Sequence, residues 1–172
     1  LAGYRHPSIC MALLSRYLPG GAMPLLDAGA GTGLLGQWLD ILDYPHVEAL
    51  DISRNMLEMA RQKGVYKAFH QHALGVELPF ADDAFAGIVS AGVFTTGHVG
   101  SNGIDELIRI CRPGGIIVLT VKGSLWDEEF CDHVAALGRR KLTELVELTP
   151  AYVSMPGEEG TKPSRGVVLR VL

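Results

Sequence analysis

The sequence predicts an α/β fold in which helices cover both faces of a largely parallel sheet. Short apolar strands alternate with helical segments along most of the 172 residues, as in a doubly wound sheet. One strand, 85–92, is apolar without interruption, which is typical of a strand buried on both faces. A run of glycines follows the first strand, where the chain must turn tightly into a helix.

The individual elements follow from apolar spacing and from glycine and proline punctuation. An N-terminal helix spans 7–18, because Ile9, Leu13 and Tyr17 recur at helical spacing before Pro19. Further helices are expected at 33–42, 54–63, 102–111 and 128–142, and strands at 24–28, 47–51, 68–73, 85–92, 116–121, 146–153 and 166–172. Segment 156–165 is a polar glycine- and proline-containing loop rather than a linker, so we expect a single domain over 1–172.

The most informative segment, 25–36, contains a buried strand ending near Asp27, a turn with glycines at 29, 31 and 33, and the start of a helix. Glycine at every second position removes the Cβ atoms that would keep a ligand off the backbone. The unpaired N–H groups at the helix start favour an anion or a carboxylate. Asp27 instead suits a cationic or hydroxyl-bearing group. Both requirements are met by a zwitterionic amino acid joined to a nucleoside.

A second carboxylate, Asp51, ends the strand 47–51 and lies 18 residues beyond Gly33. In a βαβ unit this spacing places a carboxylate beside the glycine turn, where it can accept hydrogen bonds from ribose hydroxyls. The alternative interpretation of Asp51 is the N-cap of the helix that starts near Ser53.

The run Asp27-Ala28-Gly29-Ala30-Gly31-Thr32-Gly33, followed by Leu50-Asp51-Ile52-Ser53, resembles the class I S-adenosylmethionine (SAM)-dependent methyltransferases. Segments 51–61, 78–80 with 85–89, and 111–118 resemble later motifs of that family in the right order, so the resemblance covers about 24–123. It implies a Rossmann-like, doubly wound sheet of seven strands, mostly parallel, with an antiparallel last strand. A narrower likeness, to the Williams–Beuren region methyltransferase-like group, rests on 64–67, 73–75 and the stretch before His98.

The resemblance also implies a set of residues that bind SAM. They are Asp27, Ala28, Gly29, Gly31, Gly33 and Asp51 of the two motifs, Ile52 and Met56 flanking the adenine, Ala73 and Leu74 at the adenine edge, and Ser90 beneath the sulfonium. Simple core packing is the alternative for Ile52 and Met56. Leu74 departs from the acid that many relatives carry there, so the adenine amino group would have to find a backbone partner.

The acceptor side is expected after the strand 85–92. Gly92 would let the methyl donor or acceptor approach closely, and 94–98 should line the acceptor pocket, with an apolar wall from Phe94. His98 is the candidate general base because histidine titrates near neutral pH, although a histidine after a strand is more often a surface or packing residue. Tyr4 could cover the amino-acid end of the donor or simply anchor the N-terminal helix.

Composition narrows the functional classes. The net charge is −4 and basic residues form no long run, so no nucleic-acid partner is indicated. No apolar run is long enough to span a membrane, and no signal-peptide pattern opens the chain. The three cysteines and six histidines lack metal-type spacing, which predicts no metal and a reduced, cytoplasmic setting. Because the chain begins at Leu1, we expect its N-terminus to be incomplete.

These observations together predict a SAM-dependent methyltransferase that acts by in-line displacement on a small-molecule acceptor. An NAD(P)-dependent oxidoreductase is the alternative, because Gly31-Thr32-Gly33-Leu34-Leu35-Gly36 formally satisfies the G-x-G-x-x-G pattern. A nucleotide-binding module of the same fold without catalytic activity is the third interpretation.

Overall fold

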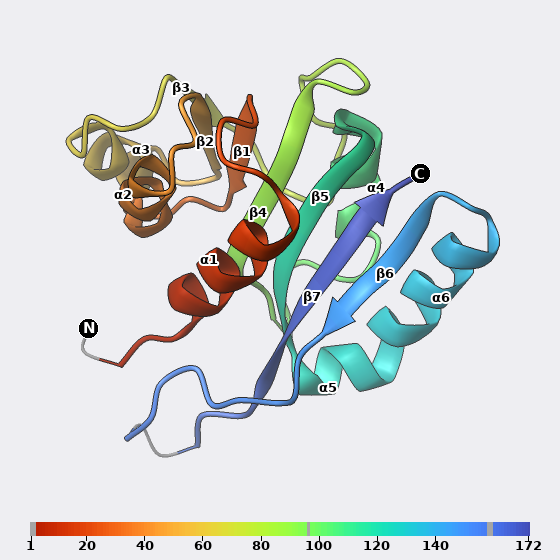
Figure 1. Cartoon of the computed structure of the whole chain (residues 1–172). Coiled ribbons are helices and arrows are strands. Elements are labelled where there is room, and N and C mark those ends of the chain that lie inside the picture. The colour runs from red at the N-terminus through yellow and green to blue at the C-terminus, as the bar shows by residue number, and fades with distance from the viewer. Residues whose placement is uncertain (1–2, 96, 158–159) are drawn as a thin grey trace.

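The computed structural model describes residues 3–95, 97–157 and 160–172 (Figure 1). Its strands are β1 (Leu25–Ala28), β2 (Val47–Asp51), β3 (Ala68–Gln71), β4 (Phe85–Phe94), β5 (Cys111–Lys122), β6 (Thr143–Leu148) and β7 (Ser164–Val171). Its helices are α1 (His6–Tyr17), α2 (Leu34–Ile41), α3 (Arg54–Arg61), α4 (Gly103–Ile110), α5 (Gly123–Leu125), the π-helical η1 (Trp126–Phe130) and α6 (Cys131–Arg139).

The seven strands form one sheet in the order β3-β2-β1-β4-β5-β7-β6. β1 pairs in parallel with both β2 and β4, whereas β7 runs antiparallel to both β5 and β6. The strand order reverses direction between β1 and β4, and ligands bind at such a switch point outside the carboxyl ends of the strands. The predicted fold class is therefore confirmed, including the antiparallel last strand.

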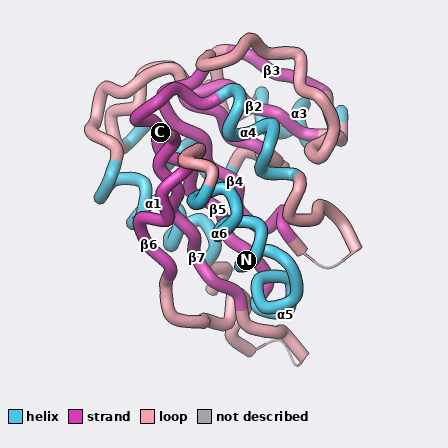
Figure 2. Tube along the Cα trace, turned by 90° about the vertical axis from the view of Figure 1, so that its right-hand side faces the viewer, coloured by secondary structure: helices cyan, strands magenta, loops and turns pink. Residues whose placement is uncertain are grey.

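Helices cover both faces of the sheet, as Figures 1 and 2 show. On one face, α1, α2 and α3 pack their apolar side chains, such as Leu14 and Leu39, against Val89 and Val118. On the other face, α4 and α6 pack Leu107 and Leu137 in a core that also contains Ile117. Neighbouring β5 residues alternate between the two cores, so this strand is buried on both sides, as its continuous apolar character indicates.

Several predicted boundaries are wrong. β6 begins at Thr143 and ends at Leu148 rather than spanning 146–153. Its pairing with β7 is interrupted around Pro150, which has no N–H to donate to a ladder, and resumes only as an isolated bridge between Tyr152 and Ser164. β3 ends at Gln71, which leaves Ala73 in the following loop. The helical region expected at 128–142 begins earlier, at Gly123, and is divided by η1.

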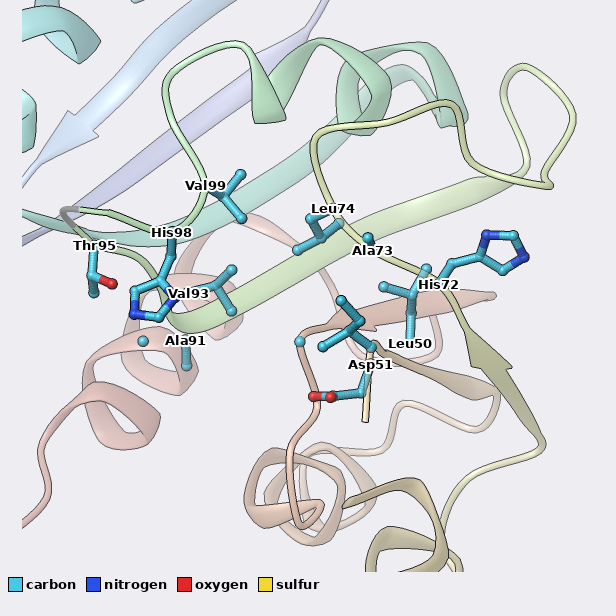
Figure 3. A pocket seen from close by; sticks show the side chains of 13 residues that line it. Leu50, Asp51, His72, Ala73, Leu74, Ala91, Val93, Thr95, His98 and Val99 are labelled. Atoms are coloured by element: carbon cyan, nitrogen blue, oxygen red, sulfur yellow. The ribbon is translucent and has the colours of Figure 1, made fainter. Parts of the chain in front are cut away.

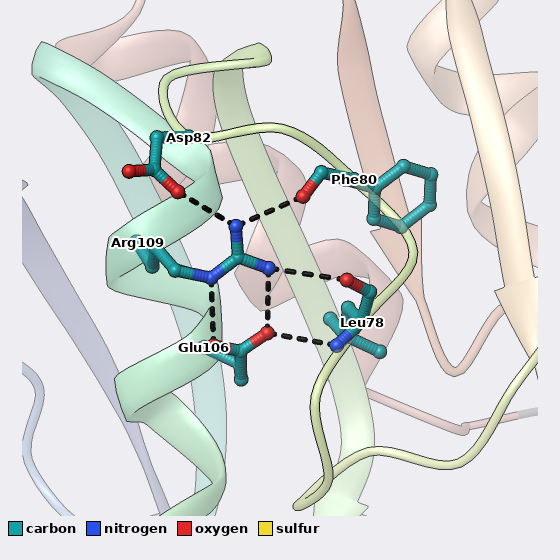
Figure 4. Close-up of polar contacts among 5 residues, drawn as sticks. All are labelled: Leu78, Phe80, Asp82, Glu106 and Arg109. Atoms are coloured by element: carbon teal, nitrogen blue, oxygen red, sulfur yellow. Dashed lines mark hydrogen bonds and ion pairs between the residues drawn. The ribbon is translucent and has the colours of Figure 1, made fainter.

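Arg109 anchors the long connection between β3 and β4 (Figure 4). Arg109 of α4 donates to the backbone carbonyls of Leu78 and Phe80 and to the carboxylates of Asp82 and Glu106. Glu106 in turn accepts the backbone N–H of Leu78 at 2.8 Å. This cluster fixes the end of a connection whose earlier residues reach the switch point.

Within the part of the chain that the structure describes, no helix is long and apolar enough to cross a membrane. The same residues contain no group of three or more His, Cys, Asp or Glu side chains placed to hold a metal ion.

Candidate ligand site at the carboxyl ends of β1, β2 and β4

The predicted glycine turn between β1 and α2 adopts a left-handed backbone. Gly29, Gly31 and Gly33 have φ angles of 84°, 55° and 82°, which residues other than glycine rarely adopt. A Cβ at Gly29 would collide with Val93, so β4 can approach only because residue 29 has no side chain. A Cβ at Gly31 would meet no atom within 4 Å and would project into open space, where a ligand can contact the backbone instead.

Asp51 holds this turn in place. Its Oδ2 accepts the Gly31 N–H and its Oδ1 accepts the Ser53 N–H, both at 2.8 Å. The N-cap of α3 is Ser53, whose hydroxyl accepts the Met56 N–H, so the N-cap interpretation of Asp51 is wrong. A carboxylate has lone pairs beyond these two bonds, and the Asp51 side chain lies beside the cavity described below.

Asp27 lies beneath the turn and is fully buried. Its Oδ2 accepts a 2.6 Å hydrogen bond from the Tyr66 hydroxyl, which itself accepts the Gly36 N–H at 3.0 Å. The pKa of Asp27 is raised to about 7, mainly by burial. The hydrogen bond from Tyr66 lowers this pKa, and the negative charge of Asp51 raises it further. Its Oδ1 has no hydrogen-bond partner. A buried, unpartnered carboxylate oxygen is costly unless some group satisfies it.

Gly36 is explained by the same contact. A Cβ there would lie 2.6 Å from the Tyr66 hydroxyl oxygen, so only glycine lets Tyr66 reach both its partners. Packing therefore requires the third glycine of the G-x-G-x-x-G pattern, and the pattern is weaker evidence for dinucleotide binding.

A cavity of about 480 Å³ opens over the switch point (Figure 3). Leu50, Asp51 and Ala73 lie on one side of it, and Ala91, Thr95 and His98 on the other. A smaller cavity of about 120 Å³ shares Gly29 and Ala91 with it and is lined by Tyr4, Gly31, Thr32 and neighbouring apolar residues. The pair of cavities provides a long, mostly apolar compartment with polar groups at defined points, as small-molecule sites usually do.

The predicted site residues divide into two groups. The first group lines one cavity or both, and it consists of Gly29, Gly31, Asp51, Ile52, Ala73, Leu74 and His98. Asp27, Ala28, Gly33, Met56 and Ser90 are not among the lining residues. Ala28 and Ser90 are fully buried, and the Ser90 hydroxyl donates to the Ala28 carbonyl at 2.6 Å, which ties β4 to β1. Gly33 is the N-cap of α2, and Met56 is exposed on α3.

The expected apolar wall from Phe94 is wrong. Phe94 is fully buried and packs edge-to-face on Phe130 in the core, and Val93 and Val99 line the cavity instead. Phe94 lies in the same core as Ile88, an even number of residues earlier, so the alternation of side chains along β4 places it in that core.

Sequence reasoning also missed the role of Tyr66 and the position of His72, which lines the cavity. No local signal pointed to Tyr66, because its carboxylate partner lies 39 residues away in the chain.

Comparison with known proteins gives a consistent result. A family model described as "Methyltransferase domain" matches residues 26–119. The chain is 36% identical over 97 residues to a demethylmenaquinone methyltransferase of Clavibacter sepedonicus, covering 55% of this chain and 39% of that protein. It is 31% identical over 119 residues to the uncharacterized methyltransferase YodH of Bacillus subtilis, covering 66% of this chain and 50% of that protein.

The chain thus spans half or less of the length of these two curated relatives. A solved structure described as an S-adenosylmethionine dependent methyltransferase from Mesorhizobium loti superposes with a TM-score of 0.72 and 16% identity, covering 98% of both chains. At that identity the similarity shows the fold alone.

Proposed function

The chain belongs to the class I SAM-dependent methyltransferase family, and on that premise we propose that it binds SAM at the β1–β4 switch point and methylates a small-molecule acceptor. The observation that carries the proposal is the Asp51 carboxylate, which is fixed on the glycine turn and borders the larger cavity. The cytoplasmic setting expected from the sequence belongs to the same proposal, supported by the three free cysteines.

The residues of the two cavities fit the parts of SAM. The larger cavity offers Asp51 for ribose hydroxyls, with Ile52, Ala73 and Leu74 as apolar contacts for a base. The smaller cavity offers the left-handed backbone of Gly29 and Gly31 for the amino-acid portion. The unpartnered Oδ1 of Asp27 lies beneath the same turn and supplies an acceptor that an ammonium group, directly or through water, can satisfy.

Bound SAM supplies a methyl group already activated on a sulfonium sulfur. The protein's contribution is to hold an acceptor atom in line with that methyl and to keep water away, and alignment alone can lower a barrier by about 7–11 kcal/mol. The residues placed for this are those at the end of β4, where Gly92 has no side chain and lines the larger cavity. A small acceptor is supported by the size of the cavity, about 480 Å³, and by the relative named demethylmenaquinone methyltransferase.

Calorimetric titration tests the proposal. We expect the protein to bind S-adenosylhomocysteine (SAH), the product of methyl transfer, and not NADH. Binding of NADH in preference to SAH would overturn the proposal in favour of the oxidoreductase. SAH binding without methyl transfer from labelled SAM to any member of a broad acceptor panel would instead favour the inactive nucleotide-binding module.

A further inference from the structure

Three aromatic side chains from the two ends of the chain meet at the end of β4. The Tyr4 hydroxyl lies over Gly92, 2.6 Å from the position that a Cβ would occupy there, and Cδ2 of His6 lies 3.5 Å from the same point. Nδ1 of His6 is hydrogen-bonded to the Tyr152 hydroxyl at 2.7 Å. The His6 ring makes edge-to-face contacts with both tyrosines. Residues that are 146 positions apart are thus brought to one point.

Backbone contacts hold this cluster rigidly. The Arg5 N–H donates to the Ser154 carbonyl at 2.9 Å, and Tyr152 exchanges two backbone hydrogen bonds with Ser164 of β7. Gly92 has a φ of 75°, and its N–H donates to the Thr120 hydroxyl at 2.7 Å. The backbone beneath the cluster is therefore as fixed as the side chains above it.

The position of Tyr4 relates the two cavities. Tyr4 lines the smaller cavity, while Gly92, which its hydroxyl covers, lines the larger one. The tyrosine ring therefore borders the compartment assigned to the amino-acid portion of the donor, and its hydroxyl reaches the point where the two compartments meet. In the proposed function, that junction is where the sulfonium methyl faces the acceptor.

The cluster presents donors and positive charge. Burial raises the pKa of both Tyr4 and Tyr152, so both hydroxyls keep their protons and can donate. Burial and the positive charge of Lys122, the last residue of β5, lower the pKa of His6 to about 4, so the ring is neutral. A weak, buried base of this kind is poorly suited to removing a proton from an alcohol.

The first carboxylate to consider is Asp27, whose charge adds to the effect of burial in raising the pKa of Cys10 and does not contribute to the raised pKa of Tyr4 or Tyr152. Glu128 and Glu129 border a hollow that adjoins the larger cavity at Thr95, His98 and Val99, and Glu129 accepts the Ser101 N–H at 3.2 Å. Among the described residues, the side chains nearest to Gly92 are Tyr4 and His6, so an acceptor that arrives there as a cation meets no carboxylate.

Lys122 borders the cluster, because it pairs with Ser164, which in turn pairs with Tyr152. We propose that the Tyr4 hydroxyl, positioned by the His6–Tyr152 pair, binds the nucleophilic atom of the acceptor, and that this acceptor is an ionised oxygen acid, namely a carboxylate or an acidic phenol or enol. This inference rests on the proposed function. An oxygen lone pair of the anion forms the new bond to the methyl carbon, the sulfur–carbon bond breaks with its electron pair going to sulfur, and no proton moves. Tyr4 donates to the oxygen throughout, and Lys122 offsets its charge during binding. His6 and Tyr152 are positioning residues.

The test uses SAH-saturated protein and measures binding of benzoate, with benzylamine as the matched cationic probe. We expect benzoate to bind and benzylamine not to bind. The Tyr4→Phe variant keeps the ring and removes only the hydroxyl, so SAH affinity should be unchanged while benzoate binding weakens roughly 10- to 150-fold, the loss of one hydrogen bond to a charged group. Tyr17→Phe is the control. It removes a hydroxyl of α1 that donates to Glu147 of β6, and it should change neither the SAH affinity nor the benzoate affinity.

Two further measurements keep the outcomes distinct. Tyr152→Phe should weaken benzoate binding less than Tyr4→Phe does, because it only frees the His6 ring to turn. With labelled SAM, benzoate, octanoate and nitrophenol should be methylated in preference to benzylamine and octylamine. Stronger binding or faster methylation of the amines overturns the inference, as does an equal loss of SAH and benzoate affinity in Tyr4→Phe, or no benzoate binding at all. Failure of the wild-type protein to bind SAH would overturn the proposed function itself.

Discussion

Asp51 offers the sharpest test of the ligand site. Its carboxylate has two functions, and replacing the side chain by alanine would not distinguish between them. It accepts the N–H groups of Gly31 and Ser53 in the protein alone, and in the proposed complex it also accepts ribose hydroxyls. Asp51→Ala would remove both functions together and leave two backbone donors without an acceptor. Asp51→Asn keeps the shape and one acceptor oxygen, so it is the better perturbation.

The expected magnitudes follow from the number of bonds. Replacing one oxygen by NH2 places a donor opposite a backbone N–H, which should lower the free energy of unfolding by about 1–3 kcal/mol. A ribose hydroxyl bonded to the charged carboxylate contributes about 1.5–3 kcal/mol, roughly 10- to 150-fold in Kd. The first loss affects the free protein, and only the second depends on the ligand.

A double-mutant cycle separates the two. Calorimetry would measure the Kd of SAH and of its 2′-deoxy and 3′-deoxy ribose analogues for wild type and Asp51→Asn, with urea denaturation giving the stability of each. A direct contact predicts a coupling energy of about 1.5–3 kcal/mol between the substitution and at least one hydroxyl. Asp40→Asn, on the exposed face of α2, is the control. Strictly additive effects for both hydroxyls would refute the ribose assignment and leave Asp51 with a role in the turn alone.

Burial holds the pKa of Asp27 at about 7, above its ordinary 3.8, so the stability that the protonated group contributes is complete below the ordinary value and is lost as pH rises through 7. Urea denaturation across that window should show wild type losing stability relative to Asp27→Asn, and parallel curves would contradict the burial argument. Gly92→Ala should cost about 1–2 kcal/mol from its left-handed backbone and displace the Tyr4 hydroxyl, so an unchanged melting temperature would count against the geometry. Arg109→Ala should destabilise the fold by about 1–2 kcal/mol and speed amide exchange at Leu78, whereas native exchange there would show that the connection holds without the arginine.

The local sequence pattern was sufficient to predict those features that depend on a single helix, strand or turn. The apolar run 85–92 predicted a strand buried on both faces, and the glycines at 29, 31 and 33 predicted a tight turn into a helix. Asp51 was placed correctly at the strand end because the spacing within a βαβ unit is nearly fixed. Side-chain periodicity and glycine conformation are properties of a few neighbouring residues, so they can be read before any packing is known.

The register and the side-chain directions at the end of β4 could not be predicted from local pattern. Phe94 lies in the same core as Ile88 and packs on Phe130, while Val93 lies against the glycine turn. The β4–β5 pairing is irregular between Ser90 and Phe94, and which side chains border the cavity depends on that pairing and on the elements packed around it rather than on β4 itself.

The sequence by itself determined the fold class, the glycine turn, the carboxylate beside it and the family to which they belong, because each of these depends on short-range spacing. Only the tertiary structure decided which groups meet those elements: Tyr66 on Asp27, and Tyr4 and His6 with Tyr152 over Gly92. These contacts join residues 39 and 146 positions apart. Their formation depends on how whole helices and strands pack on the sheet, and that packing is a property of the complete core rather than of any local pattern.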